Sequence, residues 1–193
     1  MAKLYFRYGT VGSAKTLNLL AVAHNYRQQS KEVLLLKPSM DDRFGKEFIQ
    51  SRAGLRMSAD LLLSDDSVIN EDLLRNISCV LVDEAQFLSA KIIDQFRDIA
   101  TNHNVPVICY GLRSDFKTKL FEGSKRLLEL ADTVEEIKTT CNFCNKKSIF
   151  NLRVQNGVPT AEGASIQIGD PDYEKYLPVC AVCYNKKLAE GRI

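Results

Sequence analysis

The feature that most restricts how this chain can fold is an octapeptide near its start. Its residues are Gly9, Thr10, Val11, Gly12, Ser13, Ala14, Lys15 and Thr16. They fit the frame G-x-x-x-x-G-K-[ST] at every required position except Ala14, where the frame has glycine. A short apolar run at 4–8 precedes the frame, and apolar residues at helical spacing follow it, so the sequence predicts strand, loop and helix.

In this context the backbone N–H groups at the start of the helix surround phosphate oxygens, Lys15 reaches the outer phosphates, and the Thr16 hydroxyl binds Mg²⁺. The octapeptide therefore predicts a site for ATP. The alternatives are an ordinary glycine-rich turn and a degenerate loop that no longer binds ATP. We expect the loop to accept the methyl group of Ala14, because alanine adopts right-handed helical angles without strain and Gly12 adds flexibility nearby.

A second apolar run, at 77–82, ends in two adjacent acids, Asp83 and Glu84. In an open parallel sheet, ligands collect outside the carboxyl ends of the strands, so these acids are expected beside the phosphate loop. We expect Asp83 to hold Mg²⁺, directly or through water, and Glu84 to accept a proton from an attacking hydroxyl. The alternative is a solvated turn after a buried strand. The predicted phosphate loop beside these acids favours a nucleotide site over this alternative.

Apolar runs that alternate with helical segments indicate a parallel sheet covered on both faces. The predicted fold class is α/β, a P-loop NTPase (RecA-like) parallel sheet with helices on both faces, plus a small C-terminal zinc ribbon. The strands are expected at 4–8, 33–36, 77–82 and 105–110. Further helices are expected near 71–75, 90–100 and 124–130. From about Thr140 helical periodicity stops, and strand-like pieces at 148–153 and 164–168 flank a loop.

Four of the six cysteines form two pairs at C-x-x-C spacing: Cys141, Cys144, Cys180 and Cys183. Four thiolates at this spacing are typical of a closed tetrahedral zinc site, in which the metal is structural because no coordination position is open. Disulfides are the alternative, which a reducing compartment disfavours. Zinc would fix the base of the long loop between the pairs, which could act as a lid. Cys79 and Cys109 lie in apolar runs and are expected to be buried.

Size and charge exclude several classes of protein. A chain of 193 residues suffices for one main core with an appendage, so we divide it into a nucleotide-binding domain at 1–138 and a zinc-binding domain at 139–193. The formal net charge of +2 predicts no nucleic-acid partner. The apolar runs are too short to cross a membrane, and Arg7 interrupts any signal peptide, so we expect a cytoplasmic protein.

Several motifs together resemble one enzyme family. They are the segments 1–16, 37–43, 83–87, 110–116 and 121–124 and both cysteine pairs. In order along almost the whole chain, they resemble the thymidine kinases of the cytosolic, zinc-containing type. The resemblance implies ATP-dependent transfer of a phosphoryl group to the 5′-hydroxyl of thymidine, giving thymidine monophosphate (dTMP) and ADP. It also implies a homotetramer and feedback inhibition by thymidine triphosphate (dTTP).

The resemblance assigns residue roles as well. Glu84 matches the catalytic base, Arg43 an arginine near the transferred phosphate, and Asp41 an acid of the same segment; without the resemblance, Asp41 and Arg43 would be read as a charged surface loop. Gln86 is assigned with Asp83 to the nucleotide side. The residues that match the thymidine pocket, otherwise expected to be core, are Phe87, Leu112, Phe116 and Phe121. Those that match a lasso loop around the thymine are Ser165, Ile166, Gln167, Ile168 and Tyr176.

Two departures from the family pattern bear on activity. Ala14 replaces glycine, and Val11 stands where the family commonly has a methionine near the thymine methyl group; both concern turnover and base selectivity more than fold. Ala14 motivates an alternative function, a catalytically weakened nucleotide-binding zinc protein of the same fold. A RecA-like motor or zinc-ribbon nucleic-acid protein is a further alternative, and it predicts salt-sensitive DNA binding.

Overall fold

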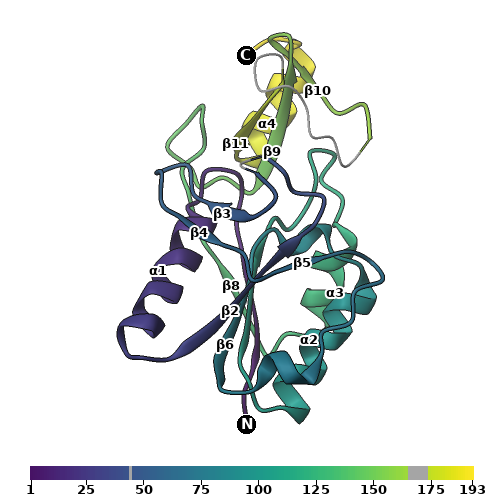
Figure 1. Cartoon of the computed structure of the whole chain (residues 1–193). Helices are drawn as coiled ribbons and strands as arrows, with labels where there is room; N and C mark the ends of the chain where they lie inside the picture. Colours follow the sequence, from purple (N-terminus) through teal and green to yellow (C-terminus); the bar gives the residue numbers. More distant parts are fainter. Residues whose placement is uncertain (44, 165–173) are drawn as a thin grey trace.

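A six-stranded parallel sheet with strand order β5-β2-β6-β7-β1-β8 forms the centre of the molecule (Figure 1). The structure is a computed structural model that describes residues 1–43, 45–164 and 174–193. The strands are β1 Leu4–Tyr8, β2 Glu32–Pro38, β5 Leu61–Leu63, β6 Ile77–Val82, β7 Val107–Gly111 and β8 Thr133–Glu136. In β2, β6 and β7, long runs of consecutive residues are buried, as expected for strands covered on both faces.

Helices cover both faces of this sheet, which confirms the predicted fold class. Helix α1, Lys15–Gln28, lies on one face, and α2, Ala90–Asn102, and α3, Glu122–Leu130, lie on the other (Figure 1). The buried side chains of α2 share one face of the helix because they recur at spacings of three, four and seven residues. They are Ile92, Ile93, Phe96, Ile99 and Ala100. Cys79 and Cys109 are fully buried in the sheet, as predicted.

Several short elements were not expected from the sequence. They include a hairpin of β3, Phe48–Gln50, and β4, Arg56–Ser58, and the edge strand β8. The helix predicted near 71–75 is a single 3₁₀ turn, η1 Glu71–Leu74. A second such turn, η2 Ala85–Phe87, follows the acidic strand end. Elements of three or four residues contain too few positions for a periodic pattern to be recognised.

The C-terminal residues form a small antiparallel sheet and one helix. The sheet has the order β10-β9-β11, from β9 Phe150–Gln155, β10 Val158–Thr160 and β11 Glu174–Val179, and α4, Ala181–Glu190, packs beside it. The strand-like piece predicted at 148–153 overlaps β9, whereas the piece at 164–168 lies almost wholly outside the described residues. The prediction that helical structure stops near residue 140 is wrong, because α4 follows the second cysteine pair.

The C-terminal sheet sits directly over the phosphate loop and bonds to it (Figure 1). The Thr10 hydroxyl shares a hydrogen bond of 2.8 Å with the Ser148 hydroxyl, and the Val11 N–H donates to Asn151 Oδ1 at 2.9 Å. These bonds join residues on the two sides of the domain boundary predicted near Lys138. The division into two domains stays a prediction. They tie the C-terminal sheet to the phosphate loop. Among the described helices, none has the length and hydropathy needed to span a bilayer.

Candidate active site at the carboxyl ends of the strands

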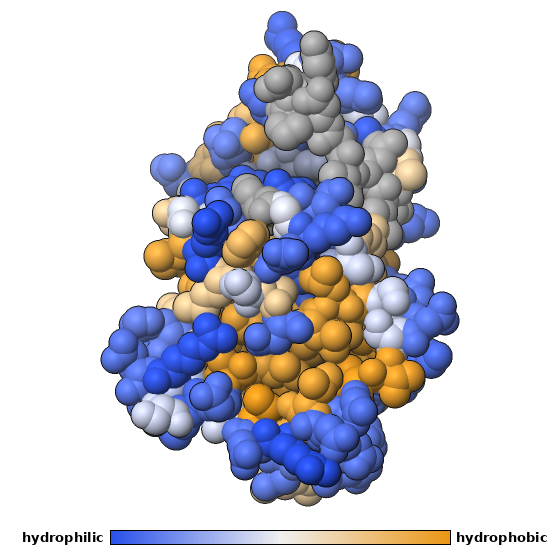
Figure 2. Space-filling model, viewed as in Figure 1, coloured by the Kyte–Doolittle hydropathy of each residue, from blue (hydrophilic) through white to orange (hydrophobic). Residues whose placement is uncertain are grey.

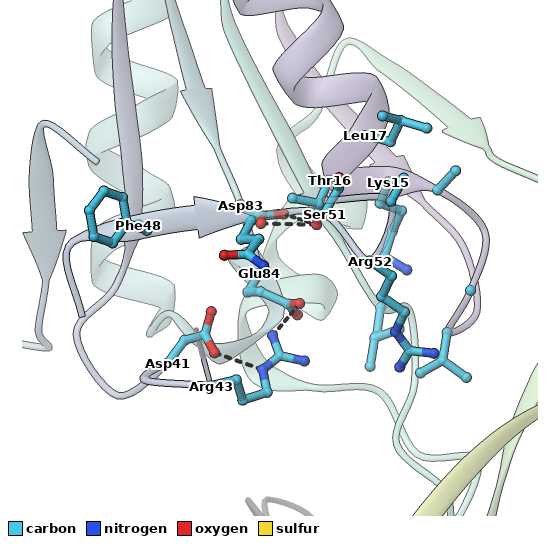
Figure 3. Close-up of a pocket in the computed structure, with 16 residues that line it drawn as sticks. Lys15, Thr16, Leu17, Asp41, Arg43, Phe48, Ser51, Arg52, Asp83 and Glu84 are labelled. Carbon is cyan, nitrogen blue, oxygen red and sulfur yellow. Dashed lines mark hydrogen bonds and ion pairs between the residues drawn. The ribbon is translucent and has the colours of Figure 1, made fainter. Parts of the chain in front are cut away.

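A cavity of about 240 Å³ opens where β1, β2, β6 and β7 end, as the position rule for parallel sheets requires (Figure 3). It brings together the phosphate loop, the acidic strand end and the segment after β2. The residues that line it are Val11, Gly12, Ala14, Lys15, Thr16, Leu17, Asp41, Arg43, Phe48, Gln50, Ser51, Arg52, Ala53, Asp83, Glu84 and Leu112.

The phosphate loop folds around its own lysine. Lys15 Nζ donates to the carbonyl oxygen of Thr10 at 2.8 Å and to Ser13 Oγ at 3.4 Å. Burial lowers the pKa of Lys15 to about 8, although the charges of Glu84 and Asp83 oppose that shift. Gly9 has no room for a side chain, because an added Cβ would lie 2.4 Å from both the Ile137 carbonyl oxygen and Ser13 Oγ. The loop therefore holds the Lys15 ammonium in a fixed position through bonds to its own residues.

Ala14 has a conformation that the sequence analysis did not expect. Its φ and ψ are 63° and 27°, in the left-handed region, so the prediction of right-handed angles is wrong. The turn into α1 causes this, because Ala14 is the N-cap residue and its carbonyl oxygen already accepts from Asn18 N at 2.9 Å. A non-glycine residue in this region costs about 1–2 kcal/mol. Ala14 is thus a strained residue in the phosphate loop.

Thr16 and Asp83 join the phosphate loop to the acidic strand end. Thr16 Oγ1 lies 3.2 Å and 3.0 Å from the two carboxylate oxygens of Asp83 (Figure 3). Burial, followed by the neighbouring charge of Glu84, raises the pKa of Asp83 to about 7. A hydroxyl and a carboxylate held together at a phosphate loop are hard oxygen ligands of the kind that Mg²⁺ prefers.

Glu84 carries a carboxylate that is fixed on both oxygens. Oε1 accepts from Arg43 Nη2, and Oε2 accepts from Gln86 Nε2 at 2.5 Å. Burial alone would raise the pKa of Glu84, but the positive charges of Arg43 and Lys15 outweigh it and hold the pKa below its ordinary value. Its φ of 48° is left-handed, a strained conformation for glutamate, and its side chain lines the cavity. Glu84 is therefore an ionised, oriented carboxylate, the state that a proton acceptor needs.

Arg43 lies between two acids. Its Nε donates to Asp41 Oδ1 at 2.7 Å while its Nη2 contacts Glu84, so the guanidinium bridges the segment after β2 and the end of β6 (Figure 3). The side chain of Arg43 remains 41 % exposed toward the cavity. The side chain of Arg43 therefore lines the cavity while it is bound to both acids.

Gln86 and the predicted pocket residues lie beside this centre. Gln86 is buried and accepts from Leu112 N at 3.0 Å in addition to donating to Glu84. Leu112 lines the cavity, whereas Phe87 and Phe121 form an edge-to-face pair at 5.6 Å, and Phe116 and Tyr176 form a tilted pair at 6.2 Å. Neither aromatic pair is among the residues that line the cavity. Ser165, Ile166, Gln167 and Ile168 lie outside the described residues.

The β3–β4 hairpin forms a wall of the cavity that the sequence analysis missed. It contributes Phe48, Gln50, Ser51, Arg52 and Ala53. The guanidinium of Arg52 is close enough to Lys15 for its charge to lower that lysine's pKa, after burial. The signal that could have revealed it is Gly54 between two short runs that contain apolar residues, 48–50 and 56–58; the structure gives Gly54 a φ of 89°.

The four paired cysteines converge near one end of the C-terminal sheet. Their sulfur atoms all lie within 4.8 Å of one another, and the distances from Cys144 Sγ to Cys180 Sγ and to Cys183 Sγ are both 3.7 Å. Metal–sulfur bonds of about 2.3 Å in a tetrahedron place the sulfurs about 3.8 Å apart. The N–H groups of Phe143 and Cys183 point at Cys141 Sγ and Cys180 Sγ, both at 3.5 Å. The cluster therefore fits a zinc ion.

Arg153 of β9 is a further residue that sequence reasoning missed. It is almost fully buried, its Nε pairs with Glu174 Oε1 at 2.5 Å, and its Nη1 donates to the Glu162 carbonyl oxygen at 2.7 Å. The hydroxyl of Tyr176 donates to the same Glu174 oxygen at 2.8 Å, and the guanidinium lies 5.0 Å from the Phe116 ring centroid. Arg153 thus joins Glu162, which precedes residues 165–173, to Glu174, which follows them.

Comparison with known proteins identifies the family. Residues 2–184 match the family described as "Thymidine kinase". The thymidine kinase of Lactiplantibacillus plantarum is 45 % identical over 182 residues, which cover 93 % of this chain and 94 % of that protein. That of Lactococcus lactis subsp. lactis is 46 % identical, covering 96 % and 98 %, and that of Streptococcus pyogenes serotype M3 is 44 % identical, covering 95 % and 97 %. The chain belongs to the thymidine kinase family.

Proposed function

We propose that this protein transfers the terminal phosphoryl group of ATP to the 5′-hydroxyl of thymidine, giving dTMP and ADP. The observation that carries the proposal is a single cavity lined by Lys15, Thr16, Asp83, Glu84 and Arg43. Phosphoryl transfer requires little beyond alignment and charge stabilisation, which is what these groups can supply. The family membership of the chain names the substrates, since its relatives carry the name thymidine kinase.

On the nucleotide side, residues 9–16 bind the triphosphate through backbone N–H groups, and the Lys15 ammonium binds the outer phosphates. Thr16 Oγ1 and the Asp83 carboxylate would hold Mg²⁺ between them. When bound, that ion neutralises charge on the phosphate oxygens. Gln86 acts on this side through its bond to Glu84, which keeps the carboxylate turned toward the cavity.

Glu84 acts as the base that accepts the proton of the thymidine 5′-hydroxyl as the oxygen attacks the phosphorus. Arg43, which lines the cavity, stabilises the negative charge of the phosphoryl group during transfer, and the ion pair with Asp41 holds Arg43 in place. The proton leaves on the Glu84 carboxylate, and the bond between the phosphorus and the leaving oxygen of ADP breaks.

On the nucleoside side, Leu112 is the one predicted pocket residue that also lines the cavity among the described residues. We place the thymine against Phe87, Phe116 and Phe121, with Tyr176 and residues 165–168 covering it. Val11 faces the cavity near this region, so base selectivity would depend on it. Arg153, which joins the residues flanking 165–173, would fix the ends of the covering loop.

The C-terminal part of the chain, 139–193, serves in this proposal as a zinc-binding domain that carries the lasso loop. Zinc bound by the four cysteines is structural, because four sulfur ligands close its coordination. Cysteines that serve as zinc ligands instead of forming disulfides are typical of a reducing compartment, which supports a cytoplasmic location.

We also propose a homotetramer that is inhibited by dTTP. Figure 2 shows apolar surface gathered over the side of the molecule where the edge strand β5 and its neighbour β2 lie. In the connection from β5 to β6, Val68 is 76 % exposed and Leu73 is 43 % exposed. Apolar side chains left exposed together favour association with another chain. As an end product carrying a thymine and a triphosphate, dTTP can occupy both halves of the site.

The test is thymidine-dependent formation of ADP and dTMP at saturating ATP, Mg²⁺ and thymidine, with the zinc content measured on the same sample. We expect turnover with thymidine and none when thymidine is omitted. The competing function, a weakened nucleotide-binding protein, is favoured by the strain at Ala14 and predicts that ATP binds without turnover. Tight ATP binding with no dTMP from a zinc-loaded sample would reject the kinase.

A further inference from the structure

The penultimate residue of β2 is a lysine buried where its neighbours are apolar. Lys37 is 1 % exposed, and it follows Val33, Leu34, Leu35 and Leu36, which are all buried. A buried ammonium is costly unless every N–H finds an acceptor. Lys37 Nζ has three acceptors within reach: the Phe48 carbonyl oxygen at 3.0 Å, the Gly45 carbonyl oxygen at 3.5 Å and Asp41 Oδ2 at 3.4 Å. Two hydrogen bonds to carbonyl oxygens and one ion pair thus offset the burial of this charge.

All three acceptors belong to one segment, 41–48, which leaves β2 and enters the β3–β4 hairpin. Asp41 is its first residue, Gly45 lies in its middle, and Phe48 is its last residue and the first of β3. A single ammonium therefore draws the two ends of the segment toward the end of β2. Arg43 is carried on this segment, so its position depends on how the segment is held.

Asp41 connects Lys37 to Arg43 directly. Its two carboxylate oxygens are divided, Oδ2 to Lys37 and Oδ1 to Arg43 Nε at 2.7 Å, and Arg43 then reaches Glu84. Burial would raise the pKa of Asp41, but the charges of Arg43 and Lys37 hold it below the ordinary value, so the carboxylate stays ionised between them. Lys37, Asp41, Arg43 and Glu84 form a row of alternating charges that leads from the sheet into the cavity.

We propose that Lys37 is a positioning residue for phosphoryl transfer, which anchors Asp41 and the start of the hairpin and thereby aims the Arg43 guanidinium at Glu84 and the transferred phosphate. This inference rests on the proposed function. It differs from a purely structural role, since a leucine would fill the same place in β2 but could not bind the three oxygens of segment 41–48.

The test is a double-mutant cycle of Lys37→Met and Arg43→Met. Lys37→Met keeps much of the side chain's volume and removes the ammonium. We expect it to lower kcat about 10- to 100-fold, because misplacing a reacting group by about 1 Å costs about that much, with KM for thymidine within about threefold. In the Arg43→Met background the same change should cost less than about twofold, since the group that Lys37 positions is already gone.

Ile49→Ala is the matched control. Ile49 is 1 % exposed on β3, next to Phe48, so its truncation loosens the hairpin without touching a charge. Loosening the hairpin lowers kcat through a route that does not pass through Arg43, so we expect the effect of Ile49→Ala to be additive with that of Arg43→Met, whereas the effect of Lys37→Met should not be. Asp41→Asn gives a second route if Lys37→Met folds poorly. It should also couple to Arg43→Met.

A readout independent of turnover separates this inference from the proposed function. Hydrogen exchange across residues 39–50 should be at least about fivefold faster in Lys37→Met than in wild type, because an anchor of the segment is lost. Additive effects of Lys37→Met and Arg43→Met, or unchanged exchange at 39–50, would overturn the positioning role. If wild type makes no dTMP, the proposed function fails and the positioning role fails with it, whereas turnover in wild type with additive mutations rejects the positioning role alone.

Discussion

The phosphate loop and the cysteine cluster are both places where polar groups converge, but they are held in opposite ways. At the phosphate end, cations and anions lie side by side, and the chain itself supplies partners for Arg43 and Lys15. Arg43 lies between Asp41 and Glu84, and Lys15 binds the Thr10 carbonyl oxygen. This end is organised by the parallel sheet, whose strand ends deliver the groups.

At the cysteine end, four like groups converge. Burial and the neighbouring sulfurs raise the pKa of Cys183 to about 12, because a second thiolate is unfavourable beside the first. A divalent cation removes this conflict by favouring the thiolate at every ligand. The two ends therefore differ in what they need: the phosphate end is preorganised by the chain, and the cysteine end is completed by an ion.

Loss of the metal is the largest effect that the comparison predicts. Cys144→Ser should reduce bound zinc to a small fraction and cost several kcal/mol locally, since structural zinc contributes about 10 kcal/mol or more in small domains. Hydrogen exchange should rise strongly in β9, β11 and α4, while the six-stranded sheet keeps its protection. Cys79→Ala is the control, because Cys79 is buried in the sheet away from the cluster and should leave zinc bound. Full protection of α4 without metal would contradict the comparison.

The largest effect at the phosphate end should be on rate and not on structure. Glu84→Gln is expected to lower kcat about 10²- to 10⁴-fold, as loss of a general base does, with the Kd for ATP changed less than about threefold. Steady-state turnover and calorimetric ATP binding measure the two quantities. Glu47→Gln is the matched control, since Glu47 is an exposed acid of the same region that does not line the cavity. Equal turnover in wild type and Glu84→Gln would remove Glu84 from the mechanism.

The sequence predicted what depends on periodic pattern and strand-end position. The apolar face of α2 and the buried runs of β1, β2, β6 and β7 are long enough to be recognised, and the rule for parallel sheets then places Asp83 beside Thr16. The same reasoning missed α4. That helix begins between the two cysteines of the second pair, and these residues were interpreted as metal ligands and not as the start of a helix.

Contacts between distant segments could not be predicted in the same way. The three acceptors of Lys37 and the two partners of Arg153 are set by where the chain turns, and no spacing in the sequence reports them. The left-handed angles of Ala14 belong to this class too. Residue type favoured a right-handed conformation there, and the geometry of the loop entering α1 overrode it.

The lowered pKa of Lys15 should make the affinity for ATP depend on pH, an effect smaller than the loss of turnover in Glu84→Gln. Burial lowers it to about 8, so above pH 8 the ligand-free protein prefers the neutral amine, whereas a triphosphate binds the ammonium. ATP binding must then take up a proton, and the apparent affinity should fall about tenfold between pH 7 and pH 9. Lys15→Arg should remove this dependence because the guanidinium stays charged. The Kd for ATP across this range measures it, and a flat profile in wild type would contradict the lowered pKa.

The smallest effect concerns strain within the phosphate loop. Ala14→Gly should stabilise the protein by up to about 1 kcal/mol. Glycine removes the cost of left-handed angles, about 1–2 kcal/mol, but its greater entropy in the unfolded chain cancels part of that gain. Ala21→Gly, at an exposed interior position of α1, should destabilise by about 1 kcal/mol, so the same substitution has opposite signs seven residues apart. Thermal or denaturant unfolding measures both. If Ala14→Gly destabilises the protein as Ala21→Gly does, the chain's own bonds do not impose the loop geometry, and the phosphate end depends on its ligand as the cysteine end depends on zinc.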